Sequence, residues 1–436
     1  MHVIFPTQKL TNPYIYQIGL KKIIILFLSV ISLFFHADAA SAEVKVETVA
    51  DNLKLPWELV FTPDGRIFFT ERDGKLWIIE NESLDLVATF PVSFGPPESE
   101  GGLLGLALDP EFEKNNFLYL YQTYFDFEMW HNKVVRYTVS NNQLTDEQII
   151  IDEIPGARWH DGGRIKFGPD EKIYITTGDA TDPNLAQKID SLAGKILRIN
   201  ADGTIPDDNP FESSPVFSYG HRNPQGIDWT ENGILVSSEH GPSGYAIELS
   251  YCEAKKLLGK IESCAGSYFG HDEINVIEPG ENYGWPIIVG DSNNLEYTNP
   301  ILHSDILTWA PSGLLYYDSD KIPEWNGKFL VATLRGQHVM VLDLDLENSR
   351  VNSVEKIFQD EYGRIRDLVQ SPDGDVFILT SNGNNDKILL VTALETPPST
   401  VDTKESLSSL GEYLVYGIII AAIVMGAAVL IKRKKK

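Results

Sequence analysis

The most regular feature of the chain is a unit made of an apolar segment, a tight turn and a strand with alternating apolar and polar residues. The turns contain Pro-Asp-Gly or a similar run, which supplies the backbone angles that a tight turn needs. Alternation with period two is typical of a strand with two different faces. The unit occurs at 61–71, 108–122, 167–179, 228–239, 323–334 and 371–381. Six copies, spaced at about 50–60 residues, predict an all-β fold, a six-bladed β-propeller, with seven blades as the nearest alternative.

The N-terminal region has a different pattern. Lys21 and Lys22 precede an apolar run at 23–35, and small residues follow at 37–42. This layout is typical of a secretory signal peptide, predicted here as residues 1–42. The leader before Lys21 is longer than usual, so an uncleaved anchor stays open as an alternative.

The C-terminal region predicts a membrane anchor. Residues 413–431 are uncharged and apolar over about 19 positions, enough for a helix to cross a bilayer, and the basic tail 432–436 follows directly. The positive-inside rule places this tail in the cytoplasm and the rest of the protein outside. Residues 395–412 are polar and rich in Pro, Ser and Thr, which indicates a flexible stalk. We therefore expect a single-pass protein of the cell membrane that displays a propeller at 43–394 on the outside.

Charge narrows the choice of partners. Residues 43–412 hold 28 basic and 61 acidic residues, a net charge of −33. Such an acidic domain argues against nucleic acid, because binding to phosphates needs a positive surface. The only two cysteines, Cys252 and Cys264, lie in one short segment of an exported chain, which favours a disulfide between them. A zinc site is disfavoured because no second Cys or His pair stands at zinc spacing.

Polar residues gather just after the strands of the repeated units. These strands are interpreted as the inner strands of the blades, so the residues that follow them are expected to ring the axial channel. The polar segments are 70–72, 177–179, 238–242, 333–335 and 380–382. His160 stands before a glycine pair and one such strand, at the mouth of the β-structure, where a base can meet a ligand. A structural hydrogen bond from a loop is the alternative role for a lone histidine.

An ordered set of motifs resembles the pyrroloquinoline-quinone (PQQ)-dependent sugar dehydrogenases, namely soluble glucose dehydrogenase and the aldose sugar dehydrogenases. The resemblance runs from about Leu55 to Thr392. Its most specific motifs are W-H-D-G-G-R-I, Y-G-H-R-N-P-Q-G-I, S-E-H-G-P and N-Y-G-W-P. The resemblance implies a six-bladed propeller with the quinone across the channel mouth, in agreement with the repeat count.

The resemblance also implies roles for individual residues. His160 matches the base that takes the proton from the anomeric hydroxyl of the sugar while hydride passes to the quinone, a role that suits imidazole near neutral pH. Arg222 and Asn223 match the pair beside the reactive carbonyls of the quinone, where a guanidinium would stabilise the charge formed on reduction. Arg335, Arg364 and Arg366 match the basic residues that hold the carboxylates of the cofactor. Pairing with nearby carboxylates is the alternative for one of these arginines.

The implied metal is Ca²⁺. Gly241 and Pro242 match the positions whose backbone carbonyls bind a Ca²⁺ that bridges to the quinone; carbonyl ligands suit this hard cation. Two departures from the family pattern stand out. Glu100 lies near the cofactor where Gln is common, and its carboxylate would repel an anionic quinone unless it were protonated or turned away. The insertion between Gly244 and His271 carries both cysteines, and is interpreted either as a loop over the mouth or as a stapled surface loop.

The sequence thus favours a membrane-anchored enzyme that oxidises aldoses to lactones with bound PQQ and Ca²⁺. Its electrons would pass to an external acceptor such as a cytochrome, a copper protein or a quinone. Two other functions stay open. One is a non-catalytic propeller that serves as a receptor or scaffold, because fold alone does not decide function. The other is a Ca²⁺-dependent lactonase.

Overall fold

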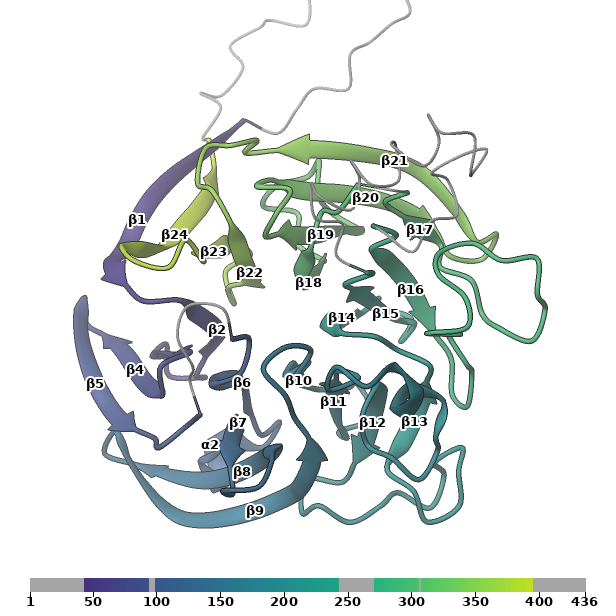
Figure 1. Ribbon diagram of the computed structural model, residues 1–436. Helices are drawn as coiled ribbons and strands as arrows, with labels where there is room; N and C mark the ends of the chain where they lie inside the picture. Colours follow the sequence, from purple (N-terminus) through teal and green to yellow (C-terminus); the bar gives the residue numbers. More distant parts are fainter. Residues whose placement is uncertain (1–42, 94–98, 243–269, 306, 395–436) are drawn as a thin grey trace, which may run out of the picture. The chain divides into compact units, whose positions relative to one another are not determined.

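The computed structural model describes residues 43–93, 99–242, 270–305 and 307–394. Its strands form six four-stranded antiparallel sheets arranged around a central axis, so the predicted six-bladed propeller is confirmed (Figure 1). The predicted signal peptide, stalk, membrane helix and basic tail, and both cysteines, lie outside the described residues. Within the described ranges, no helix is long and apolar enough to span a bilayer.

The first three sheets follow one another along the chain, each with four sequential strands. The first contains β2 (Pro56–Phe61), β3 (Ile67–Glu71), β4 (Lys75–Glu80) and β5 (Ser83–Thr89). The second contains β6 (Leu103–Leu108), β7 (Phe117–Phe125), β8 (Trp130–Ser140) and β9 (Gln143–Pro155). The third contains β10 (Ile165–Phe167), β11 (Ile173–Thr177), β12 (Lys195–Ile199) and β13 (Val216–Tyr219). Two short helical turns, α2 (Phe112–Asn115) and η1 (Pro183–Gln187), lie in the connections.

The last three sheets complete the ring. The fourth contains β14 (Pro224–Trp229), β15 (Leu235–Glu239), β16 (Glu273–Ile277) and β17 (Leu302–His303). The fifth contains β18 (Pro311–Tyr317), β19 (Lys328–Thr333), β20 (Val339–Asp345) and β21 (Arg350–Ile357). The sixth contains β22 (Ile365–Gln370), β23 (Val376–Thr380), β24 (Asp386–Ala393) and, as its outer strand, β1 (Val44–Leu53).

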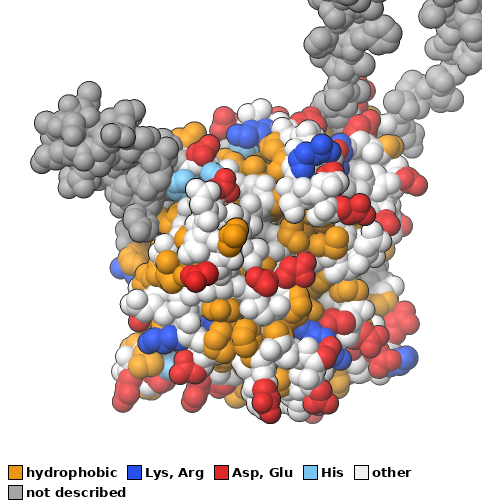
Figure 2. Space-filling view, turned by 90° about the vertical axis from the view of Figure 1, so that its right-hand side faces the viewer, with side chains coloured by type: hydrophobic (Ala, Val, Ile, Leu, Met, Phe, Trp, Pro, Cys, Tyr) orange, Lys and Arg blue, Asp and Glu red, His pale blue; other side chains and the backbone are white. Residues whose placement is uncertain are grey.

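The pairing of β1 with β24 closes the ring. Val44 lies opposite Ala393 and Leu53 opposite Asp386, so the two ends of the described domain share one sheet. Because the ring is closed, only short, protected strand edges remain between the blades. Such edges do not offer a long unpaired strand to another chain. Acidic side chains are spread over the side of the molecule in Figure 2 rather than gathered in one patch.

The structure corrects one detail of the sequence interpretation. Each repeated unit spans the turn from the first to the second strand of a blade, and the innermost strand is the one before the turn (Figure 1). The innermost strands are β2, β6, β10, β14, β18 and β22. Pro56, at the start of β2, pairs with Glu71, at the end of β3, so the polar ends of the second strands lie at the same end of the channel as the starts of the innermost strands. We call this end the mouth.

Candidate active site

His160 is held in an unusual backbone conformation at the mouth. Its φ is +65°, in the left-handed region that residues other than glycine rarely adopt. Gly178 packs directly against the His160 backbone, where a Cβ would collide with the His160 carbonyl group. The T-T-G-D sequence therefore has glycine at this position because two chain segments meet there without room for a side chain. Strain of this kind is commonly stored at functional sites.

The His160 imidazole is oriented by partners on both nitrogens. Nδ1 lies 2.7 Å from Asp179 Oδ1, and Nε2 lies 2.9 Å from an Nη of Arg222. Because a guanidinium only donates hydrogen bonds, these contacts assign the proton to Nδ1 and a lone pair to Nε2. Asp179 is itself fixed by a 2.8 Å hydrogen bond from the Trp285 indole to Oδ2. His160 is thus a half-buried imidazole whose basic nitrogen faces Arg222 at the mouth.

Arg222 is positioned by a buried glutamate. Glu239 Oε1 accepts hydrogen bonds from the backbone N–H groups of Arg222 and Asn223, and Glu239 Oε2 lies 2.8 Å from His221 Nδ1. The Arg222 guanidinium also donates to the His240 carbonyl at 3.2 Å. One carboxylate at the end of β15 therefore fixes the segment that carries Arg222.

Asn223 lies buried behind Arg222. Its Oδ1 accepts from the Gly162 backbone N–H at 3.0 Å, and its Nδ2 donates to Glu100 at 3.2 Å. The carboxamide thus joins three segments of the mouth. Its predicted contact with a cofactor stays a prediction.

Glu100 is ionised and turned toward the His160 segment. Its Oε2 accepts from the His160 backbone N–H at 2.8 Å as well as from Asn223. Burial would raise the pKa of Glu100, but the electrostatic influence of the His160 and His240 rings, the hydrogen bond from the His160 backbone and the Arg222 guanidinium together lower it to about 2. Glu100 is therefore ionised rather than protonated, and it also lines the cavity at the mouth, so the expected repulsion of an anionic quinone stays a prediction.

Four arginines line a cavity of about 280 Å³ at the mouth, namely Arg72, Arg335, Arg364 and Arg366, together with Glu100, Trp159 and His240. Arg366 donates to Gln225 Oε1 at 2.9 Å and to Ser312 Oγ at 3.1 Å. Its buried Nε has no hydrogen-bond partner among the described residues. Burial and the neighbouring Arg72, Arg364 and Arg164 lower the pKa of Arg366 to about 9. Positive charge therefore exceeds negative charge around this cavity, which suits an anionic ligand.

The comparisons with known proteins agree with this geometry. The family model described as glucose/sorbosone dehydrogenase matches residues 53–390. The chain belongs to the glucose/sorbosone dehydrogenase family. Aldose sugar dehydrogenase YliI of Escherichia coli is 30% identical over 376 residues, which cover 80% of this chain and 93% of that protein.

Two solved structures share the fold and part of the sequence. A putative glucose dehydrogenase from Thermus thermophilus is 35% identical with a TM-score of 0.69, covering 80% of this chain and 99% of that one. The PQQ-bound aldose sugar dehydrogenase from Streptomyces coelicolor is 30% identical with a TM-score of 0.67, covering 81% and 99%.

The turn at Gly241 and Pro242, predicted to bind Ca²⁺ in this member of the glucose/sorbosone dehydrogenase family, is built around Asp272. Asp272 Oδ1 accepts from the Gly241 N–H at 3.0 Å, while Oδ2 accepts from Thr308 Oγ1 at 2.7 Å. The Pro242 carbonyl accepts from the Gly270 N–H at 2.7 Å, which leaves one lone pair for a cation. Among the described residues, no group of three or more His, Cys, Asp or Glu side chains could hold a metal ion. A cation at this turn would therefore depend on carbonyl oxygens.

Sequence reasoning missed several residues of the family site. Asp179 and Glu239 were noted only as polar residues at strand ends, and their partners lie 19 and 17 positions away in the chain. Arg72 also lines the cavity. It follows β3 as Arg335 follows β19, so a comparison of the repeated units could have predicted its place at the mouth. Trp159, 41% exposed at the rim, stacks under the Arg158 guanidinium, 4.8 Å from the ring centroid.

Proposed function

We propose that this protein is a PQQ-dependent aldose dehydrogenase that converts an aldose to its lactone. The observation that carries the proposal is the arrangement of His160, Asp179 and Arg222 beside an arginine-lined cavity, in a chain of the glucose/sorbosone dehydrogenase family. A non-catalytic receptor or scaffold needs neither the oriented imidazole nor the excess of buried positive charge.

The residues of this chain suit general-base chemistry. Asp179 holds the proton on His160 Nδ1, so Nε2 can accept the proton of the anomeric hydroxyl. The Arg222 guanidinium donates to that nitrogen, so a substrate hydroxyl would take its place. Trp285 stacks under the Arg222 guanidinium, 5.6 Å from the ring centroid, and keeps it next to His160. Arg222 would then stabilise negative charge that forms beside the base.

The mouth fits an anionic quinone. PQQ carries carboxylates, and Arg335, Arg364 and Arg366, joined by Arg72, would hold them. The unpartnered Nε of Arg366 and the lowered pKa of this arginine are what a missing anion would leave behind. When bound, the quinone supplies the hydride acceptor that no side chain can supply. A Ca²⁺ on the carbonyls of Gly241 and Pro242 would polarise it.

The cellular setting belongs to the same proposal. The signal peptide predicted at 1–42 and the apolar stretch at 413–431 support the proposal of a single-pass protein of the cell membrane with its propeller outside. An external cytochrome, copper protein or quinone would take the electrons, and the charge of −33 over residues 43–412 favours a basic acceptor.

The test is an activity assay of the full-length protein supplied with PQQ and Ca²⁺, a panel of aldoses and a dye as electron acceptor. We expect dye reduction and lactone formation that require both sugar and PQQ. Turnover of added lactones without PQQ would instead identify a lactonase. A folded protein that binds no PQQ with Ca²⁺ present and shows neither activity would support the receptor or scaffold.

A further inference from the structure

A second pocket lies at the end of the axial channel opposite the mouth. It has a volume of about 510 Å³, within the range of about 300–1,000 Å³ that small-molecule sites occupy. All six innermost strands contribute to it, mainly through their second halves, whereas Trp57, Gln225 and Arg366 line the cavity at the mouth. We call this pocket the axial well. None of the residues that we assign to sugar oxidation lines it.

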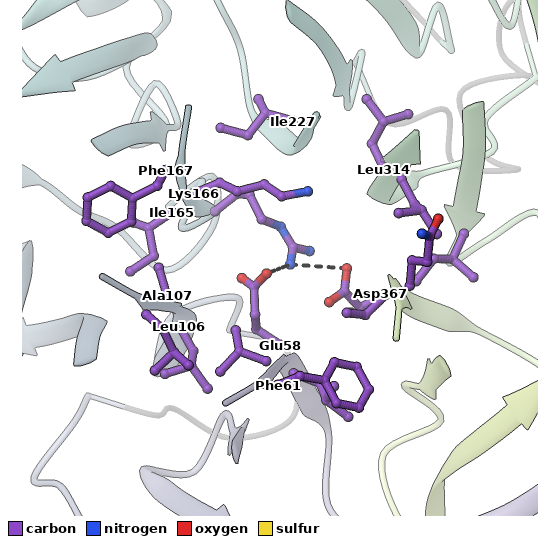
Figure 3. A pocket seen from close by; sticks show the side chains of 18 of the residues that line it. Glu58, Phe61, Leu106, Ala107, Ile165, Lys166, Phe167, Ile227, Leu314 and Asp367 are labelled. Carbon is purple, nitrogen blue, oxygen red and sulfur yellow. Dashed lines mark ion pairs between the residues drawn. The ribbon is translucent and has the colours of Figure 1, made fainter. Parts of the chain in front are cut away.

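Most of the wall of the axial well is apolar. Its side chains include Phe61, Leu106, Phe167, Ile227 and Leu314, which surround the channel in Figure 3. A wall of this kind contacts an alkyl group favourably, because contact with it removes the apolar surface of the alkyl group from water.

The inner end of the well is charged. Arg164 forms ion pairs with Glu58 at 2.7 Å and Asp367 at 3.1 Å, and the two carboxylates, from the neighbouring strands β2 and β22, lie on either side of the same guanidinium nitrogen (Figure 3). Arg164 also lies over the Trp57 ring, 4.3 Å from the centroid, on the side toward the mouth. These three charged residues therefore close the well at its inner end.

The ion pairs leave negative charge in excess. Glu58 and Asp367 are 7% and 2% exposed, and each uses one oxygen for Arg164 while Glu58 Oε2 and Asp367 Oδ2 have no hydrogen-bond partner among the described residues. The other cation of the well, Lys166, is paired with Asp228 at 2.8 Å. With both carboxylates ionised, this set of five groups has a net charge of −1. Two buried acceptors and one buried donor, Arg164 Nη2, have no hydrogen-bond partner among the described residues, so acceptors exceed donors.

We propose that the axial well is a second binding site, which takes an alkylammonium: the ammonium group donates to Glu58 Oε2 and Asp367 Oδ2, and the alkyl chain lies against the apolar wall. Three N–H donors on one cation match two unpartnered acceptors and the excess negative charge. A carboxylate with an alkyl chain of the same length would be repelled by the ionised Glu58 and Asp367. A neutral alcohol would leave the negative charge of these two residues uncompensated. The inference does not depend on the proposed sugar oxidation.

Protonation of Glu58 makes this binding sensitive to pH. Burial raises the pKa of Glu58 to about 8. Arg164, which directly precedes β10, and Lys166 within β10 oppose the shift, and Asp367 from β22 adds to it. Asp228 from β14 is the partner of Lys166. Below this pKa Glu58 is neutral and attracts a cation less. An alkylammonium, like the Lys side chain with its usual pKa of about 10.4, stays charged up to pH 9. Its affinity should therefore rise between pH 6.5 and 9.

The experiment is calorimetric titration of the full-length protein with n-hexylammonium, n-hexanol and hexanoate as probes. We expect one hexylammonium to bind for each chain, at least tenfold more tightly than the other two probes, with tighter binding at pH 9 than at pH 6.5. Equal binding of the three probes, or no binding of hexylammonium at pH 9, would overturn the proposal without any variant.

Variants locate the bound probe. Glu58→Gln keeps the shape of the side chain and removes its charge, so it should weaken hexylammonium binding at pH 9 at least tenfold and abolish the rise with pH. Glu100→Gln, the matched change at the mouth, should leave hexylammonium binding within twofold. Unchanged binding in a folded Glu58→Gln protein, or the larger loss in Glu100→Gln, would place the cation elsewhere and overturn the assignment.

Discussion

The two ends of the axial channel are built from the same six strands, but their buried arginines have different partners. At the mouth, Arg366 shares a cavity with three other arginines and is held by the neutral side chains of Gln225 and Ser312. In the axial well, Arg164 is paired with two carboxylates. Both guanidiniums lie close to Trp57, with Arg164 4.3 Å and Arg366 5.6 Å from its ring centroid.

This difference separates two uses of a buried arginine. A buried charge with ionic partners contributes to the folded structure, and removing one partner is costly. A buried charge without such partners is an unfavourable feature of the empty protein that a ligand of opposite sign can relieve. The sign of the uncompensated charge thus predicts the ligand: an anion at the mouth and a cation in the well.

The largest effect is expected at the base. His160→Ala should lower kcat for an aldose by about 10²- to 10⁴-fold, the usual contribution of a positioned general base. PQQ binding, followed by absorbance, should persist because the arginines remain. Stopped-flow reduction of the bound quinone measures the chemical step directly. Unchanged turnover would remove His160 from the mechanism.

A pair of arginine variants tests the comparison itself. Arg366→Gln should weaken PQQ binding by about 2–5 kcal/mol, the range for truncating a buried charged partner, and leave the unfolding free energy of the PQQ-free protein nearly unchanged. Arg164→Gln should instead reduce that unfolding free energy by about 3–5 kcal/mol, because two buried carboxylates lose their cation. Equilibrium unfolding in urea and PQQ titration measure the two quantities. Similar outcomes for both variants would contradict the proposed difference.

A smaller effect is expected from the residue that orients the base. Asp179→Asn should lower kcat about 10- to 100-fold, the range seen when a partner that fixes a functional histidine is changed. The KM for the sugar should change little, since Asp179 lies behind His160. Asp182→Asn, an exposed change three residues away, is the control and should stay within twofold of the unaltered protein. A change confined to KM would assign Asp179 to substrate binding instead.

Two further effects concern pH and stability. The pKa of Glu58 is raised to about 8, so the folded state holds its proton where the unfolded state has lost it, and stability falls as pH rises from about 4.5 to 8. The pKa of Glu100 is lowered to about 2, so its ionised form stabilises the folded state. This stabilisation is lost as pH falls from about 4.5 to 2. Each pKa unit corresponds to about 1.4 kcal/mol.

Unfolding in urea across pH 3–9 checks both signs. Glu58→Gln should flatten the decline between pH 5 and 8, and Glu100→Gln should flatten the decline between pH 5 and 3. If Glu58→Gln instead flattened the decline at low pH and Glu100→Gln the decline at high pH, the pKa shifts of the two glutamates would have the wrong sign.

The sequence predicted the blades because each one repeats a local signal, the turn between its first two strands. It did not predict the pairing of β1 with β24, since nothing in Val44–Leu53 indicates a partner more than 300 residues away. At the mouth, the strand-end positions of Arg335, Arg364 and Arg366 could be predicted from the repeat and the family motifs.

The buried networks were beyond sequence reasoning. The contacts of Arg164 with Glu58 and Asp367 join three different blades. Their geometry follows from ring closure and not from any local pattern. Gly178 illustrates the same limit. The position requires glycine because the His160 backbone packs against it and leaves no room for a Cβ, and this contact is visible only in the folded structure.

The most direct test of the central claim is a titration of the full-length protein with PQQ in the presence of Ca²⁺. The absorbance of the bound quinone is followed before and after aldoses are added. We predict saturation at one PQQ for each chain, and loss of the oxidised-quinone absorbance on addition of a sugar that the enzyme uses. A folded protein that binds no PQQ with Ca²⁺ present would contradict the assignment of the arginine-lined mouth as a quinone site.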